Sequence, residues 1–113
     1  MSEEIYSTIS VEELQRVSQN SSRFHLLDVR EDDEHQEYHA NISRSLPLSR
    51  LMEGRAQDDL RMPKDEPIYV ICRSGRRSAT ACELLHSQGF TTLINVAGGM
   101  EAWVKAGLAH TRA

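Results

Sequence analysis

The residues of this chain best suited to chemistry are a cysteine and the basic residues that follow it. The segment VICRSGRRSA, residues 70–79, places Cys72 at the end of an apolar run and three arginines within the next five positions. These are Arg73, Arg76 and Arg77. The thiolate is the nucleophilic form of cysteine, and neighbouring positive charge favours it. The spacing therefore indicates a reactive thiolate beside a site for an anion.

The cysteine lies where a strand of a parallel sheet would meet a helix. Residues 68–72, IYVIC, are apolar throughout and predict a buried strand, and residues 78–88 favour a helix. Ligand sites in open parallel sheets form beyond the carboxyl ends of the strands. A tight turn that leads into a helix can point backbone N–H groups at an anion. We therefore expect Ser74 and Gly75 to bind substrate together with the arginines. Ser78 is expected to form a hydrogen bond within the loop or to cap the helix.

A buried cysteine followed by a basic surface turn is the alternative interpretation. Free cysteines are often core residues without a chemical role. The glycine, the arginines and the helix start converge on Cys72, so we favour the reactive site. Cys82 lies in register with Ala79 and Leu85 on the predicted helix, and we expect it to be a small core residue.

The remaining segments alternate between strands and helices. Further strands are predicted at residues 6–9, 24–29 and 91–96, helices at about 11–18 and 100–106, and one or two helical turns from Asp32. The region 40–67 is less regular, with a brief edge strand expected at 45–48, a short helix at 49–54 and one turn around Leu60. Trp103 is expected to anchor the last helix to the core. This alternation is typical of an α/β domain with a parallel sheet.

Length and composition predict one ordinary soluble domain. The chain has 113 residues, enough for one core but too few for two, so we expect a single domain over 1–113. Its net charge of −4 argues against a nucleic-acid or acidic-membrane binder. No apolar run approaches the roughly 20 residues of a membrane span, and the first residues lack the features of a signal peptide. We expect a cytoplasmic protein with reduced thiols.

Several segments together resemble the rhodanese family of sulfurtransferases. CRSGRRS at 72–78 is similar to the family's active-site loop, C-R-x-G-x-R-S, and LLDVRE at 26–31 to its Asp-Arg strand end. Residues 89–108 resemble its terminal strand, its Gly-Gly-x-x-x-Trp helix and its Gly-Leu ending. The segment HANISRS at 39–45 departs from the family's G-H-I-x-G-A and lacks both glycines. The resemblance implies a rhodanese-like α/β fold, with a central parallel sheet of about five strands and helices on both faces.

The resemblance also implies sulfur transfer through a Cys72 persulfide. The thiolate would take the outer sulfur of thiosulfate or a low-molecular-weight persulfide, and cyanide or a thiol, including a protein thiol, would then remove it. Arg73 and Arg76 are expected to hold the anionic donor. Arg77 is expected to brace the loop, with Asp28 as a candidate partner, or to touch substrate. We expect no metal, no organic cofactor, no nucleic acid and no membrane.

Two other functions stay open beside this enzyme. One is a persulfide carrier or interaction module with little turnover alone. The other is a phosphatase of the same fold, whose loop follows the longer pattern Cys-x5-Arg. Here Arg77 follows Cys72 after four residues, and position 78 is a serine. The shorter loop favours sulfur over a phosphoryl group.

Two further groups of residues are expected to be structural. Asp28 and Arg30 end the second strand at the same rim as Cys72, and an ion pair or cap is favoured over a chemical role. His35 and His39, with Glu37 between them, have the spacing of a metal-binding pair. Their order is not H-E-x-x-H and no third ligand is evident, so a solvated helical turn is favoured.

Overall fold

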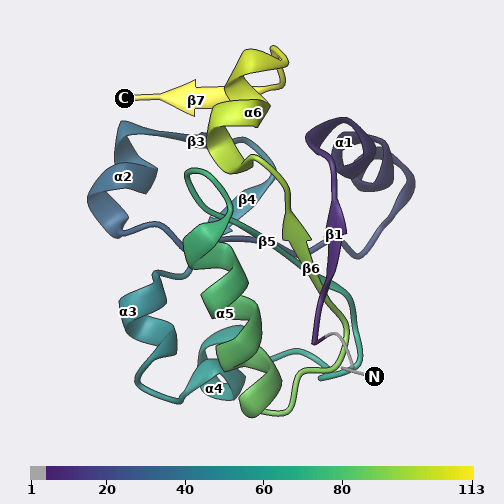
Figure 1. Cartoon of the computed structure of the whole chain (residues 1–113), viewed down its shortest axis with the longest axis vertical. Helices are drawn as coiled ribbons and strands as arrows, with labels where there is room; N and C mark the ends of the chain where they lie inside the picture. Colours follow the sequence, from purple (N-terminus) through teal and green to yellow (C-terminus); the bar gives the residue numbers. More distant parts are fainter. Residues whose placement is uncertain (1–4) are drawn as a thin grey trace.

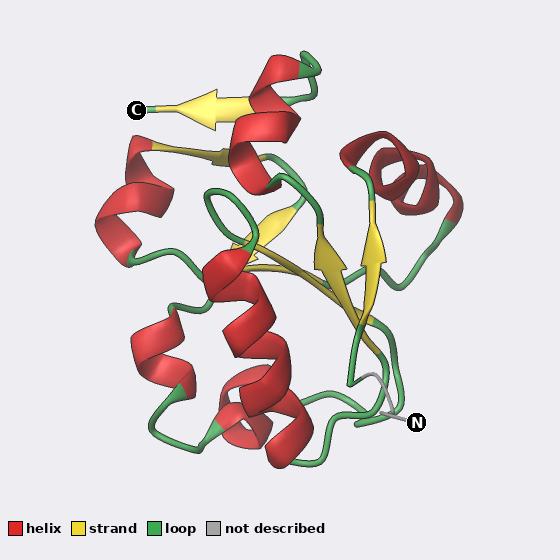
Figure 2. Ribbon diagram, viewed as in Figure 1, coloured by secondary structure: helices red, strands yellow, loops and turns green. Residues whose placement is uncertain are grey.

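Short apolar segments form a five-stranded parallel sheet in the computed structural model, which describes residues 5–113 (Figures 1 and 2). Every neighbouring pair of strands in this sheet is parallel. Across the sheet the order is β1 (Ser7–Ile9), β6 (Leu93–Val96), β5 (Ile68–Ile71), β2 (Leu26–Asp28) and β4 (Ser43–Ser45). The predicted fold class is confirmed. Residues 1–4, which belong to the predicted domain and to the segment tested for a signal peptide, lie outside the described residues.

Helices pack on both faces of this sheet because successive strand residues point to opposite sides. Leu27 and Val70 belong to one core, which they share with α3 (Leu48–Leu51), α4 (Ala56–Leu60) and α5 (Arg76–Ser87). Leu26 and Ile71 belong to a second core, with α1 (Val11–Asn20) and α6 (Gly99–Lys105) (Figure 1). Helices therefore cover both faces of the sheet, and its central strands are almost fully buried.

Two sequence predictions about the core are confirmed. Trp103 is 1% exposed and packs in the second core, where its indole N–H donates to the Ala109 carbonyl. Cys82 is fully buried in the first core. Burial and the nearby Glu83 and Cys72 raise the pKa of the Cys82 thiol to about 12. Cys82 is therefore protonated and inaccessible in the folded protein.

The edge strand lies earlier than predicted. Residues 45–48 were expected to form it, but β4 covers Ser43–Ser45 and lies next to β2 at the end of the described sheet. Pro47 has no N–H to donate to a ladder, and it instead precedes the first residue of α3. The proline therefore ends the edge of the sheet and starts a helix.

A two-stranded antiparallel pair was not predicted. It joins β3 (Tyr38–Ala40) to β7 (His110–Arg112) and follows α2 (Asp32–Glu37) directly. Strands of three largely polar residues have too little hydrophobic periodicity to be read from the sequence. This pair holds α2 beside the carboxyl end of the main sheet (Figure 2). Across residues 5–113, no helix is long and apolar enough to cross a membrane.

Candidate active site

Cys72 directly follows β5 and begins the loop that leads into α5. The residue is 1% exposed, and its Sγ accepts a hydrogen bond from the Gly75 N–H at 3.0 Å and lies 3.3 Å from Ser78 Oγ. Gly75 has a φ of 113°, which glycine adopts without a Cβ penalty. This backbone conformation lets the loop turn back on the sulfur. The Cys72 side chain is therefore surrounded by hydrogen-bond donors.

These donors make Cys72 more acidic than an ordinary cysteine. Burial raises the thiol pKa, but hydrogen bonds from the Ser78 hydroxyl and from the backbone of Ser78, Gly75 and Ser74 together lower it below its usual value. The sequence analysis predicted contributions both from backbone N–H groups and from the neighbouring arginines. The hydrogen bonds are the larger cause, because the Arg73 side chain is 69% exposed and Arg76 also points to solvent.

A buried amide behind the loop orients the Ser78 hydroxyl. Ser78 Oγ donates to Asn95 Oδ1 at 2.5 Å, and Asn95 Nδ2 donates to the Gly75 carbonyl at 3.2 Å. The second bond fixes which end of the amide faces Ser78. Asn95 lies on β6 and was not identified from the sequence. Its signal was a lone amide within an apolar strand, since buried polar groups require partners.

The start of α6 supports the loop from the other side. Met100 N–H donates to the Cys72 carbonyl at 2.8 Å, and Glu101 N–H donates to the Arg73 carbonyl at 3.1 Å. Gly99 precedes them with a φ of 55°, and a Cβ there would clash with both carbonyl oxygens. The Gly-Gly pair of the sequence is thus what allows α6 to approach the cysteine loop.

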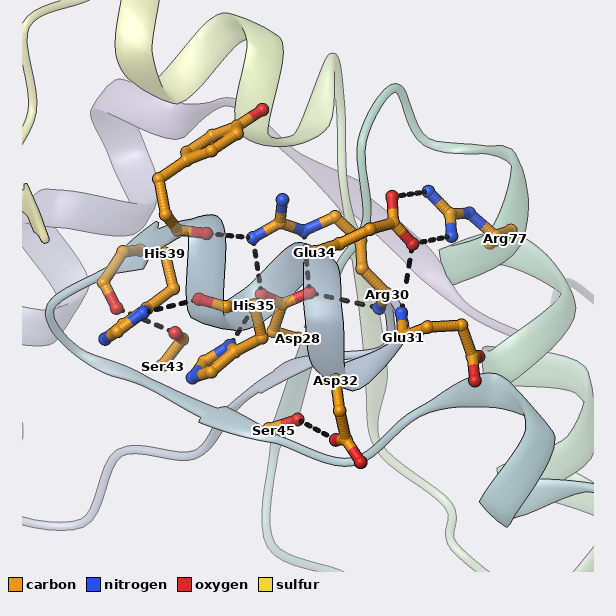
Figure 3. Close-up of polar contacts among 12 residues, drawn as sticks. Asp28, Arg30, Glu31, Asp32, Glu34, His35, His39, Ser43, Ser45 and Arg77 are labelled. Carbon is orange, nitrogen blue, oxygen red and sulfur yellow. Dashed lines mark hydrogen bonds and ion pairs between the residues drawn. The ribbon is translucent and has the colours of Figure 1, made fainter. Parts of the chain in front are cut away.

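Arg77 points to α2. Its Nη1 and Nη2 donate to the two carboxylate oxygens of Glu34 at 2.6 and 2.9 Å (Figure 3). These hydrogen bonds lower the pKa of Glu34 to about 2, despite the opposing effect of burial. The prediction that Asp28 is the partner of Arg77 was wrong, because the Asp28 carboxylate already binds Arg30 and contacts His35. Arg77 therefore links the first turn of α5 to α2.

Asp28 and Arg30 form a buried ion pair, as predicted. Arg30 Nε and Nη2 donate to the Asp28 carboxylate at 3.1 and 2.8 Å, and Nη2 also donates to the Tyr38 carbonyl. His35 Nδ1 lies 2.9 Å from the same carboxylate. This network joins the end of β2 to α2 and β3 (Figure 3).

The His35 and His39 side chains do not form the solvated turn that was expected. Their rings stack with centroids 4.0 Å apart, and the His35 side chain is only 17% exposed. Contact with Asp28 explains the partial burial of His35. Within residues 5–113, no group of three His, Cys, Asp or Glu side chains is arranged to hold a metal.

A parallel sheet with a cysteine loop between its central strand and a helix is the arrangement found in rhodanese-like α/β domains. The family model described as a rhodanese-like domain matches residues 10–106. This chain belongs to the rhodanese-like domain family.

Two solved structures illustrate the likeness. The rhodanese-like domain protein of Staphylococcus aureus is 31% identical with a TM-score of 0.72, over 86% of this chain and 90% of that chain. The rhodanese-related protein of Thermoplasma volcanium is 29% identical with a TM-score of 0.77, over 94% of this chain and 98% of that chain. Both likenesses extend over most of the chain.

Two curated proteins of Bacillus subtilis are similar over 95 residues, which is 84% of this chain. One is named "Putative sulfur carrier protein YrkF" and is 36% identical, and the other is named "Putative sulfurtransferase YtwF" and is 37% identical. The alignment covers 49% of the first protein and 87% of the second. The chain thus spans about half the length of the first of these relatives.

Proposed function

We propose that this domain is a rhodanese-type sulfurtransferase that moves a sulfane sulfur through a Cys72 persulfide. The observation that carries the proposal is the Cys72 sulfur, buried at a strand end, acidified by Ser78 and by backbone N–H groups. The names of the relatives, a sulfur carrier and a sulfurtransferase, support the same general role.

The reaction has two displacement steps. The Cys72 thiolate attacks the outer sulfur of thiosulfate, the S–S bond of the donor breaks, and sulfite leaves with the bonding electron pair. With a persulfide donor, the leaving group is a thiolate. An acceptor thiolate or cyanide then attacks the outer sulfur of the Cys72 persulfide, and Cys72 leaves as a thiolate. The donors that lower the Cys72 pKa assist the second step, because they stabilise the leaving group.

The exposed arginines of the loop bind the anionic donor. Arg73 and Arg76 both present guanidinium groups to solvent beside Cys72, and a guanidinium matches the oxygens of a sulfonate-like group. Ser78 occupies the position at which the phosphatase pattern Cys-x5-Arg requires an arginine, and it is fully buried against Cys72. This arrangement favours sulfur transfer over phosphate chemistry.

A persulfide carrier is the second candidate function, favoured by the name of the first relative. A carrier would take up sulfur in the same way and release it rapidly only to a protein thiol. Because free thiols persist in reducing compartments, we propose the cytoplasm as the site of action for either function.

The deciding experiment measures sulfur on the intact protein and its release. After incubation with thiosulfate, the mass should rise by one sulfur atom, and cyanide should release thiocyanate. Cys72→Ala should abolish both signals, whereas Cys82→Ala, the matched cysteine control, should retain them. Loading with steady turnover supports the enzyme, and loading with negligible turnover supports the carrier. No loading from thiosulfate or any persulfide, together with phosphate release from an aryl phosphate, would overturn the proposal.

The role of Arg76 is tested by comparing donors of different charge. Arg76→Ala should reduce kcat/KM for thiosulfate by about fivefold, the cost of one exposed charge contact. It should reduce the rate with a neutral alkyl persulfide much less. Arg55→Ala, which removes an exposed arginine outside the loop, is the control. Equal losses with both donors would contradict the assignment.

A further inference from the structure

A hollow of about 300 Å³ lies beside the Cys72 loop. Its lining residues are Arg30, Glu34, Glu37, Tyr38 and Arg73. Arg73 is the next residue after Cys72, and Glu34 is the carboxylate bound by Arg77 of the same loop. Two residues that line the hollow, Arg73 and Glu34, therefore also belong to or contact the Cys72 loop. None of the roles expected for the active-site residues explains the hollow.

One wall presents a guanidinium nitrogen with no acceptor among the described residues. The Arg30 side chain is only 2% exposed, and its Nε and Nη2 are occupied by Asp28 and Tyr38. Nη1 makes no hydrogen bond within the described part of the chain, and Figure 3 shows no contact to this nitrogen. Nη1 is not fully buried, although the rest of the Arg30 side chain is, so this nitrogen is accessible from outside. A guanidinium nitrogen without a protein acceptor in a residue that lines the hollow is available to bind the carboxylate of a ligand.

The hollow also contains a free negative charge. Glu37 is exposed, and its carboxylate makes no ion pair or hydrogen bond with any residue in 5–113. Glu34 differs, because both of its oxygens are held by Arg77. The Arg73 guanidinium, only loosely paired at 3.6 Å from Glu101, adds a second cation at the rim. A complementary ligand carries one carboxylate and one ammonium group.

We propose that this hollow binds the α-amino-acid end of a small thiol acceptor. The carboxylate lies on Arg30 and Arg73, and the ammonium group lies on Glu37. This inference rests on the proposed sulfur transfer and names the acceptor class. The bound thiolate attacks the outer sulfur of the Cys72 persulfide, the S–S bond breaks, Cys72 leaves as a thiolate, and the acceptor departs as a persulfide. Thiosulfate has no ammonium group to pair with Glu37, so it matches only the positively charged part of this hollow.

The test compares four thiols as acceptors. Cysteine carries both charged groups, cysteamine only the ammonium, 3-mercaptopropionate only the carboxylate, and 2-mercaptoethanol neither. The protein is first loaded with thiosulfate, and kcat/KM for each acceptor is measured with the unmodified protein and with Glu37→Gln. The variant-to-unmodified ratio cancels the intrinsic reactivity of each thiol. Asp33→Asn, on the same helix and outside the hollow, is the matched control.

We expect Glu37→Gln to lower kcat/KM by about threefold for cysteine and cysteamine, as for the loss of one exposed ion pair. The values for 3-mercaptopropionate and 2-mercaptoethanol should stay unchanged or rise, and Asp33→Asn should affect no acceptor selectively. Equal losses for all four thiols, or no loss for any, would overturn the inference while leaving sulfur transfer intact.

A binding measurement separates this inference from the proposed reaction. S-methylcysteine keeps the amino-acid end and cannot accept sulfur. In an NMR titration it should shift the backbone amides of residues 37, 38 and 73, whereas 2-(methylthio)ethanol should not. This outcome is independent of whether Cys72 takes sulfur from thiosulfate. Identical shifts with both compounds, or none with either, would contradict the proposed binding site.

Discussion

At the scale of single residues, the acidity of Cys72 depends on one hydroxyl proton. Ser78 Oγ contacts Cys72 Sγ and also donates to Asn95 Oδ1. A neutral thiol can donate to Ser78 while Ser78 donates to Asn95, but a thiolate must receive the Ser78 proton instead. Asn95 therefore competes with the thiolate for this donor, and the backbone N–H of Gly75 adds a donor that no side-chain change removes.

Replacing Ser78 by alanine should raise the pKa of Cys72. The loss of one hydrogen bond to a charged sulfur costs about 1.5 kcal/mol and disfavours the thiolate relative to the thiol. Below the pKa, the fraction of thiolate and thus the rate of alkylation should fall by about tenfold. The rate of reaction with iodoacetamide as a function of pH measures this shift, with the sigmoid moving to higher pH. Thr80→Ala, which removes an exposed hydroxyl from the same helix, should leave the profile unchanged. Coincident profiles for Ser78→Ala and the unmodified protein would contradict this role.

At the scale of helices and strands, three helices hold the cysteine loop from different sides. Helix α5 begins at Arg76, two residues earlier than predicted, so Arg76 and Arg77 belong to its first turn. Helix α6 donates two N–H groups to the carbonyls of Cys72 and Arg73. Helix α2 is joined to α5 by the Glu34–Arg77 pair. The loop conformation is therefore a product of how these helices pack.

Gly99→Ala should disturb the loop as well as the stability of the fold. An added Cβ would lie 2.6 Å from the Arg73 carbonyl oxygen and also clash with that of Cys72, in a backbone conformation unfavourable for alanine. We expect a loss of about 3 kcal/mol in unfolding free energy and slower alkylation of Cys72. Gly107→Ala is the control, because its φ is also positive but no atom lies within 4 Å of the added Cβ. Its cost should be about 1 kcal/mol, with normal reactivity of Cys72. Similar costs for the two variants would refute the close-approach argument.

The link between α2 and α5 should weaken in acid. The folded-state pKa of Glu34 is about 2, against an ordinary value of 4.5, so the unfolded chain binds the proton first as the pH falls. The stabilisation is complete above pH 4.5 and is lost progressively as the pH falls toward 2. It should be about 1 kcal/mol, because both side chains are partly exposed to solvent.

Chemical denaturation of the unmodified protein and of Glu34→Gln measures this contribution. The difference in unfolding free energy should be present at pH 7 and should shrink between pH 4.5 and the acid limit of the experiment. Glu12→Gln, which alters an exposed carboxylate on α1, supplies the baseline. A difference that stays constant across this range would show that the ion pair contributes little.

At the scale of the whole molecule, Asp28 joins the main sheet to the α2 and β3 segment. Its carboxylate contacts Arg30 and His35 and is fully buried. Arg30 in turn reaches the Tyr38 carbonyl of β3, which pairs with β7 near the other end of the chain. The network therefore fixes the positions of Arg30 and Tyr38, which line the hollow beside the active-site loop.

Asp28→Asn should therefore destabilise the whole fold. It leaves the Arg30 guanidinium buried without a counter-charge, which costs about 3 kcal/mol or more. Urea denaturation monitored by Trp103 fluorescence measures the loss. Asp33→Asn, on the exposed face of α2, should change the stability by about 0.5 kcal/mol or less. A loss for Asp28→Asn as small as that of the control would refute the structural role of the buried pair.

The sequence by itself determined the alternation of strands and helices in the main sheet, the parallel sheet and the position of Cys72 at a strand end. These features depend on local hydrophobic periodicity, on glycine and proline, and on a short motif. Only the tertiary structure decided which side chains meet. Arg77 binds Glu34 across 43 positions, and Ser78 binds Asn95 across 17. A hydrophobic pattern identifies the buried face of each element but does not specify the polar partner across it. For the same reason, the β3–β7 pair and the hollow with its free Arg30 nitrogen emerge only when distant segments pack together.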